Sequence, residues 1–115
     1  MLATKLLSAK EKKYTKIFAA LGDQIRWSLV LRLGKGTPQS ISQLTQGSNL
    51  TRQAITKHLK ILQNANIVHC TRAGRESLFT LEAQTFNDMK NYLDFVARQW
   101  DQALSRLKAF VENDN

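Results

Sequence analysis

Hydrophobic residues recur at three- and four-residue steps along much of this chain, which is the period of an amphipathic helix. Residues 8–21 follow that period and end before Gly22, so a first helix is predicted there. Asp23 can cap a second helix, which Gly34 should end because glycine favours helix C-termini. The N-terminal part is therefore predicted to be a pair of helices.

A short helix and a longer one are predicted next. Ser40 can cap the short helix, which residues 47–49 interrupt, and Thr51 can cap a helix that continues to about Ala65. One face of the longer helix is apolar, with Ala54 and His58 at its edges, and it consists of Ile55, Leu59 and Leu62. The opposite face is polar and basic, and it consists of Arg52, Gln53, Thr56, Lys57 and Lys60.

A small hairpin and a long helix are predicted for the rest of the chain. Residues 67–71 and 77–81 are β-favourable runs around a basic tip that contains Arg72 and Arg75. Residues 83–112 repeat apolar positions with a heptad pattern, formed by Phe86, Met89, Leu93, Val96, Trp100, Ala103, Leu107 and Phe110. A thirty-residue helix is about 45 Å long, which is more than the remaining core needs for its cover. The excess apolar surface predicts a homodimer.

Basic residues are concentrated in one part of the sequence. The whole chain carries a formal net charge of +8, but residues 1–75 hold thirteen basic and two acidic side chains, whereas residues 76–115 hold four and seven. Such a concentration indicates a polyanionic partner, either nucleic acid or an anionic membrane surface. The basic residues cluster on the pair of helices at residues 40–65 and on the hairpin, without an exposed apolar face, which favours DNA over lipid.

Several classes of protein are disfavoured. The apolar runs are too short for a membrane span and the N-terminal stretch does not have the pattern of a secretory signal, so a cytoplasmic protein is expected. The single cysteine, Cys70, excludes an intramolecular disulfide. An enzyme is not expected, because acidic residues are scattered, no nucleophile has an evident base, and no glycine-rich phosphate loop is present.

Four runs of this sequence resemble the ArsR-type family of bacterial winged helix-turn-helix repressors. Residues 17–26 resemble its "F-x-A-L-G-D-x-x-R" opening, and residues 50–62 its "L-S-x-x-x-V-S-x-H-L-K-x-L" recognition helix. Residues 65–68 and 72–75 resemble its "A-G-L-V" and "R-x-G-R" wing motifs. In unbroken order, the similarity covers about residues 14–82. It implies a dimeric, sequence-specific DNA-binding repressor.

The fold class expected is mainly α with a small β-hairpin, a winged helix-turn-helix with long N- and C-terminal dimerisation helices. We expect a single domain over residues 1–115, with the helix–turn–helix at 40–65, the wing at 67–81 and the C-terminal dimerisation helix at 83–112. The residues expected at the dimer interface are Tyr14, Phe18, Phe86, Met89, Leu93, Val96, Trp100, Leu104 and Leu107.

The second helix of a helix–turn–helix lies in the major groove, so the polar face beginning at residue 52 is expected to meet base edges. Arg52 can bond to guanine and Gln53 to adenine, and the Thr56 methyl can meet a thymine methyl. The residues expected to bind DNA are Thr51, Arg52, Gln53, Thr56, Lys57, His58, Lys60, Arg72 and Arg75. Two simpler interpretations stay open: Thr51 is only a helix cap, and the polar face is only solvated.

No metal or cofactor is expected. Family members that sense metals use paired cysteines before the recognition helix or His and acidic ligands on the last helix, but residues 40–44 contain no cysteine and no His or Cys follows Cys70. His69 and Cys70 point to opposite faces of a strand. Cys70 is expected to be a half-buried structural thiol, with a redox switch as the alternative. His58 is expected to pack at the helix edge or to reach a phosphate.

The turn departs from the family pattern at residues 47–49. Asn49 can adopt the left-handed conformation that a glycine supplies in the family, while Ser48 removes an apolar anchor, so a looser or differently packed turn is expected. Residues 98–101 resemble the metal-free branch, whose members often act as autorepressors. The alternatives to such a repressor are a sensor that responds to a small molecule or to thiol oxidation, and a winged-helix module that docks an acidic protein.

Overall fold

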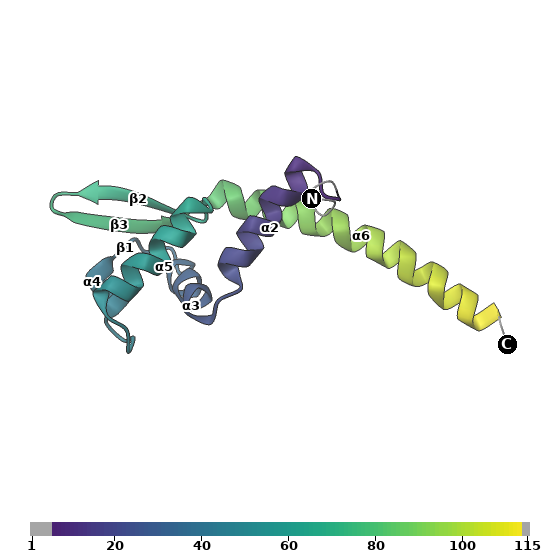
Figure 1. The fold of residues 1–115 in the computed structure, drawn as a ribbon, viewed down its shortest axis with the longest axis horizontal. Coiled ribbons are helices and arrows are strands. Elements are labelled where there is room, and N and C mark those ends of the chain that lie inside the picture. Colours follow the sequence, from purple (N-terminus) through teal and green to yellow (C-terminus); the bar gives the residue numbers. More distant parts are fainter. Residues whose placement is uncertain (1–5, 114–115) are drawn as a thin grey trace. The chain divides into compact units, whose positions relative to one another are not determined.

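A computed structural model describes residues 6–113, and the chain forms two compact units, Met1–Ala83 and Gln84–Asn115. The described elements of the first unit are α2 (Ala9–Leu21), α3 (Gln24–Leu33), β1 (Gln39–Ser40), α4 (Ile41–Thr45), α5 (Arg52–Asn64), β2 (Val68–Ala73) and β3 (Glu76–Leu81) (Figure 1). The second unit consists of α6 (Ala83–Asn113), which begins at the boundary. The fold is mainly helical with one small sheet, as the sequence predicts.

Side chains cap the starts of the helices, at Asp23 as predicted and at Ser8, which was not predicted as a cap. The Ser8 hydroxyl accepts from the backbone N–H of Glu11 at 3.2 Å, and the Glu11 carboxylate accepts from the Ser8 N–H at 3.1 Å. Asp23 Oδ1 accepts from the backbone N–H groups of Ile25 and Arg26 at 2.9 and 3.0 Å. Each cap satisfies amides that have no partner within the first turn.

The turn between α4 and α5 differs from the prediction. Gly47 takes the left-handed conformation, with φ 79°, and Asn49 does not. Glycine adopts positive φ without a Cβ clash, so Gly47 relieves Asn49 of that role. Ser48 is hydrogen-bonded within the turn, where its hydroxyl donates to the Thr45 carbonyl at 2.8 Å and accepts from the Leu50 N–H at 3.3 Å.

The guanidinium of Arg32, on α3, binds the end of α4. No local pattern in the sequence predicts this contact. Arg32 donates to the carbonyl oxygens of Gln43, Leu44 and Gln46 at 2.8, 2.7 and 3.2 Å. These carbonyls end a helix of five residues and have few partners of their own. Arg32 therefore holds the first helix of the helix–turn–helix in position.

The sheet has three antiparallel strands in the order β1–β3–β2. Strands β2 and β3 pair from Val68 opposite Leu81 to Ala73 opposite Glu76. Two residues therefore form the turn at the hairpin tip, and the first of them is Gly74, with φ 64°. The short strand β1, which was not predicted, pairs with β3 and leads directly into α4. This pairing ties the helix–turn–helix to the hairpin.

The core of the first unit lies between its helices and the sheet. The largest fully buried side chains are Leu29, Leu44, Ile55, Leu59, Leu62, Ile67 and Val68. Three of them form the predicted apolar face of α5, which the structure confirms. Within residues 6–113, the structure contains no helix with the length and apolar character needed to cross a membrane.

Candidate nucleic-acid interface

The outer face of α5 presents the predicted row of polar and basic side chains. Burial of the opposite, apolar face fixes the rotation of the helix about its axis. The exposed residues on the outer face are Arg52, Gln53, Thr56, Lys57 and Lys60. The helix therefore offers one polar, positively charged surface along its length.

Hydroxyl groups at the start of α5 are engaged by the helix itself. Thr51 Oγ1 accepts from the Ala54 backbone N–H at 3.1 Å, so this residue is a helix cap whose exposed side chain can also meet a phosphate. The Thr56 hydroxyl donates to the Arg52 carbonyl at 2.7 Å. With that proton used, Thr56 offers its methyl group, the part that suits a thymine methyl.

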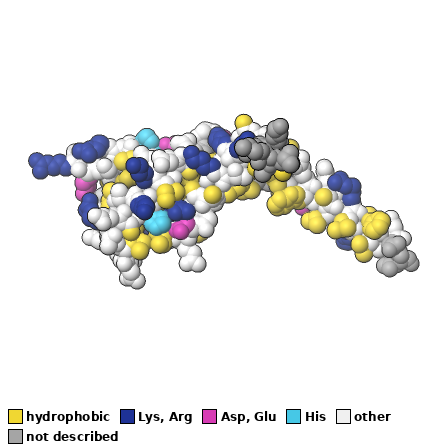
Figure 2. Space-filling model, viewed as in Figure 1, with side chains coloured by type: hydrophobic (Ala, Val, Ile, Leu, Met, Phe, Trp, Pro, Cys, Tyr) yellow, Lys and Arg dark blue, Asp and Glu magenta, His cyan; other side chains and the backbone are white. Residues whose placement is uncertain are grey.

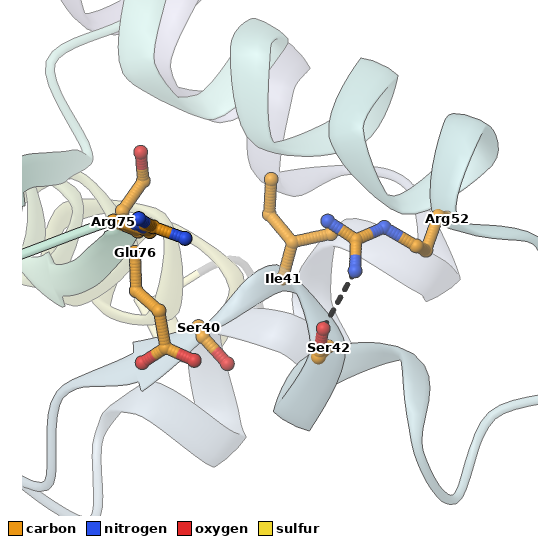
Figure 3. A pocket seen from close by; sticks show the side chains of 7 residues that line it. Ser40, Ile41, Ser42, Arg52, Arg75 and Glu76 are labelled. Atoms are coloured by element: carbon orange, nitrogen blue, oxygen red, sulfur yellow. Dashed lines mark hydrogen bonds between the residues drawn. The ribbon is translucent and has the colours of Figure 1, made fainter.

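The hairpin and the two helices of the helix–turn–helix enclose a hollow of about 300 Å³. Its lining is mostly polar and consists of Ser40, Ile41, Ser42, Arg52, Arg75, Glu76 and Ser77 (Figure 3). Arg52 Nη1 donates to Ser42 Oγ at 2.6 Å, which joins α5 to α4. The structure thus brings together two residues, Arg52 and Arg75, that the sequence placed on separate elements. Arg72 is exposed on β2 and does not line this hollow.

His58 faces the start of α3. Its Nδ1 accepts from Arg26 Nη1 at 3.3 Å and lies 4.0 Å from Asp23 Oδ1, and the side chain is 20% exposed. Arg26 in turn donates from Nε to the Ala20 carbonyl at 2.6 Å. Of the predicted DNA-binding residues, His58 is therefore the one that joins α5 to α2 and α3. Its edge position was predicted, but its partners could not be read from the periodicity.

The carboxyl of Asp23 is held in its charged form. The backbone N–H of Arg26 is the main cause of its lowered pKa, and the Arg26 charge, the Ile25 N–H and His58 act in the same direction against partial burial. A carboxyl whose pKa is lowered by folding contributes stability above its unfolded-state pKa, and that contribution is lost as the pH falls through the folded-state pKa.

Replacing Asp23 by Asn should therefore produce a pH-dependent difference in stability. Asparagine caps helices about as well as aspartate, so the D23N variant keeps the cap and loses only the charge. We expect D23N to be less stable than the wild type at pH 7, and the two to converge as the pH falls below the ordinary aspartate pKa of about 3.9. Urea unfolding of both proteins at pH 7 and pH 3 measures this; an unchanged difference would contradict the role assigned to the charge.

The cations of the α5 face and the hairpin tip are not neutralised by the protein. Among residues 6–113, the recorded ion pairs involve Arg26, His58, His69 and Lys108, none of which is an exposed cation of this surface. Figure 2 shows lysine and arginine side chains at the hairpin tip and beside α5. Unpaired cations on one surface attract a polyanion.

The potential metal ligands of the hairpin are not gathered into a site. His69 Nδ1 lies 3.1 Å from Glu82 Oε1, and Cys70 is a half-buried free thiol. No group of three or more His, Cys, Asp or Glu side chains with the spacing of a metal site occurs over residues 6–113.

The residues expected at a dimer interface fall into three groups by exposure. Tyr14 is only 5% exposed and stacks on Phe18 with 6.5 Å between ring centroids, so Tyr14 offers little surface to a second copy. Met89 is also buried, whereas Phe18, Phe86 and Val96 are half-buried. The strongly exposed members lie on α6 and are Leu93, Trp100, Leu104 and Leu107. Figure 2 shows hydrophobic side chains gathered along the C-terminal part of α6.

Comparisons with known proteins identify similar regulators. No family model matches the chain. The HTH-type transcriptional regulator Rv2034 of Mycobacterium tuberculosis is 27% identical over 99 residues, 86% of this chain and 89% of that protein. The arsenical resistance operon repressor of Bacillus subtilis is 30% identical over 78 residues, 68% and 74% of the two chains. The solved structure of an ArsR-like transcriptional regulator from Rhodococcus sp. RHA1 has a TM-score of 0.79 and 31% identity, covering 90% of this chain and 96% of that one.

Proposed function

Because the chain belongs to the ArsR family of winged helix-turn-helix transcriptional regulators, we propose that it is a homodimeric repressor that binds a near-palindromic operator without sensing a metal. Regulation of transcription through DNA binding, rather than catalysis, is what its relatives indicate.

One observation carries the DNA-binding part of the proposal. The exposed face of α5 is polar and basic and begins beside the hollow that the hairpin arginine lines. In a helix–turn–helix, the N-terminal part of the second helix meets base edges in the major groove. Gln53, Thr56 and Lys57 are then placed to select bases, whereas Thr51, Lys60, Arg72 and Arg75 are suited to the sugar–phosphate backbone.

The apolar face of α6 supports a dimer. Its exposed residues repeat at the heptad spacing that allows two helices to pack together. Two copies related by a twofold axis would present two α5 helices about one turn of DNA apart, and the operator would share that symmetry. We propose no metal control because residues 40–44 and the stretch after Cys70 do not have the ligands that metal-sensing members use.

Binding to the DNA upstream of its own gene tests the proposed function. In a gel-shift experiment, we expect a saturable complex that resists random competitor DNA and weakens steeply with added salt, because phosphate neutralisation releases counterions. Absence of such a complex at low salt, combined with specific capture of an acidic protein, would favour a protein-interaction module instead.

Gln53→Ala should reduce operator binding selectively. Glutamine can form two hydrogen bonds to adenine, and losing a bidentate contact costs about 1–3 kcal/mol on the matching site. We expect little change on random DNA, where no such contact forms. Fluorescence anisotropy with both duplexes measures this effect; an equal loss on both would assign Gln53 to the backbone.

A further inference from the structure

Arg52 does not extend freely from the start of α5. Its Nη1 donates to Ser42 Oγ at 2.6 Å, so the side chain is drawn toward α4 and one terminal nitrogen is already engaged. Bidentate recognition of guanine requires the guanidinium to present its donors to the base edge. The observed contact with Ser42 instead directs the guanidinium toward α4.

The second guanidinium of the hollow comes from the hairpin. Figure 3 shows the Arg52 and Arg75 side chains pointing toward one another from opposite sides, with Ile41 between them. Neither arginine has an ion-pair partner anywhere in the described part of the chain. Two facing cations repel each other, and an anion placed between them removes that repulsion.

Hydroxyl groups complete a set of donors suited to phosphate. Ser42 Oγ accepts from Arg52, which leaves its own proton available, and Ser40 Oγ accepts from the Gln43 N–H at 3.2 Å in the same way. Ser77 also lines the hollow. Planar guanidinium groups with neighbouring O–H donors match the several acceptor oxygens of a phosphate. The Glu76 carboxylate lines the hollow too and opposes an anion there.

We propose that Arg52, from the recognition helix, and Arg75, from the wing, clamp the same backbone phosphate of the bound DNA. Arg52 then fixes the register of α5 on the duplex instead of reading guanine, and base selection falls to Gln53, Thr56 and Lys57. This inference rests on the proposed function and refines the sequence-based expectation for Arg52. The short strand β1 pairs with the hairpin strand β3 and so holds the start of α4 beside the hairpin.

Two duplexes separate a phosphate contact from a base contact. One is selected by the wild-type protein from a random pool, and the other is a scrambled sequence of the same composition. We expect Arg52→Ala and Arg75→Ala each to lower affinity for both duplexes by roughly tenfold or more, and to reduce the slope of log affinity against log salt by about 1. Arg52→Lys should restore the salt slope but not the full affinity, because lysine lacks the planar fork. Gln53→Ala is the matched control, since it should weaken only the selected duplex.

A methylphosphonate scan of the selected duplex identifies the phosphate. Neutralising each phosphate in turn should reveal one position at which the wild-type protein loses affinity and each arginine variant loses less, because one of the two clamping groups is already absent. Glu76→Gln should strengthen binding to both duplexes. The clamp is overturned if Arg52→Ala weakens only the selected duplex, or if the two arginines map to different phosphates while circular dichroism shows both variants folded. If the wild-type protein itself fails to bind either duplex, the proposed function fails instead.

Discussion

Introducing two carboxylates on the apolar face of α6, with Trp100→Glu and Leu107→Glu together, is expected to convert the proposed dimer to a monomer. The two side chains are 66% and 57% exposed and lie one heptad apart, so they share one side of the helix. Pairing two such helices would bury the new charges without partners, which is strongly unfavourable. Light scattering after size-exclusion chromatography measures the change in mass.

The same variant should lose most of its affinity for an operator with two half-sites. A second α5 bound through the same dimer acts at a high effective concentration, which strengthens binding by about 10²–10⁴-fold, so we expect at least a hundredfold loss. Affinity for a single half-site should change little. Asn91→Glu with Gln102→Glu is the matched control, because it adds the same charge on the opposite side of α6. The role assigned to this face would be contradicted by a monomeric wild-type protein or by a control variant that dissociates equally.

Leu59→Ala is expected to lower the free energy of unfolding by about 2–5 kcal/mol. Leu59 is 1% exposed on the buried face of α5, so truncation removes apolar contacts and leaves a cavity beneath the proposed recognition surface. Urea denaturation measures the loss, at one fixed protein concentration because pairing of copies would add to apparent stability.

Lys60→Ala provides the control on the exposed face of the same helix. Lys60 follows Leu59 directly and has an exposed side chain, so its truncation should change stability by less than about 0.5 kcal/mol. Equal losses in the two variants would show that α5 is not packed by the face identified here.

Local signals in the sequence were sufficient for the helices. Asp23, Ser40 and Thr51 cap α3, α4 and α5 as predicted, because a cap depends on a side chain and amides two or three residues away. The two faces of α5 were also predictable, since a helical period separates core from surface within one element.

Contacts between distant residues were not predictable from such patterns. Strand β1 has two residues and exists only because β3 pairs with it, so no periodicity marks it. Arg32 reaches α4 and Arg52 reaches Ser42 across ten or more positions. The sequence supplied the candidate interface residues, but the fold determines that Arg52 meets the wing arginine and that His58 meets Arg26.

The central claim is that two copies of the α5 face and the wing bind one symmetric site. Selection of bound duplexes from a random pool, followed by measurement of the mass of the complex, tests it most directly. We expect an inverted repeat with half-sites centred about 10 base pairs apart, bound by two protomers. A failure to enrich any sequence, or a saturated complex of one protomer on an asymmetric site, would contradict the account.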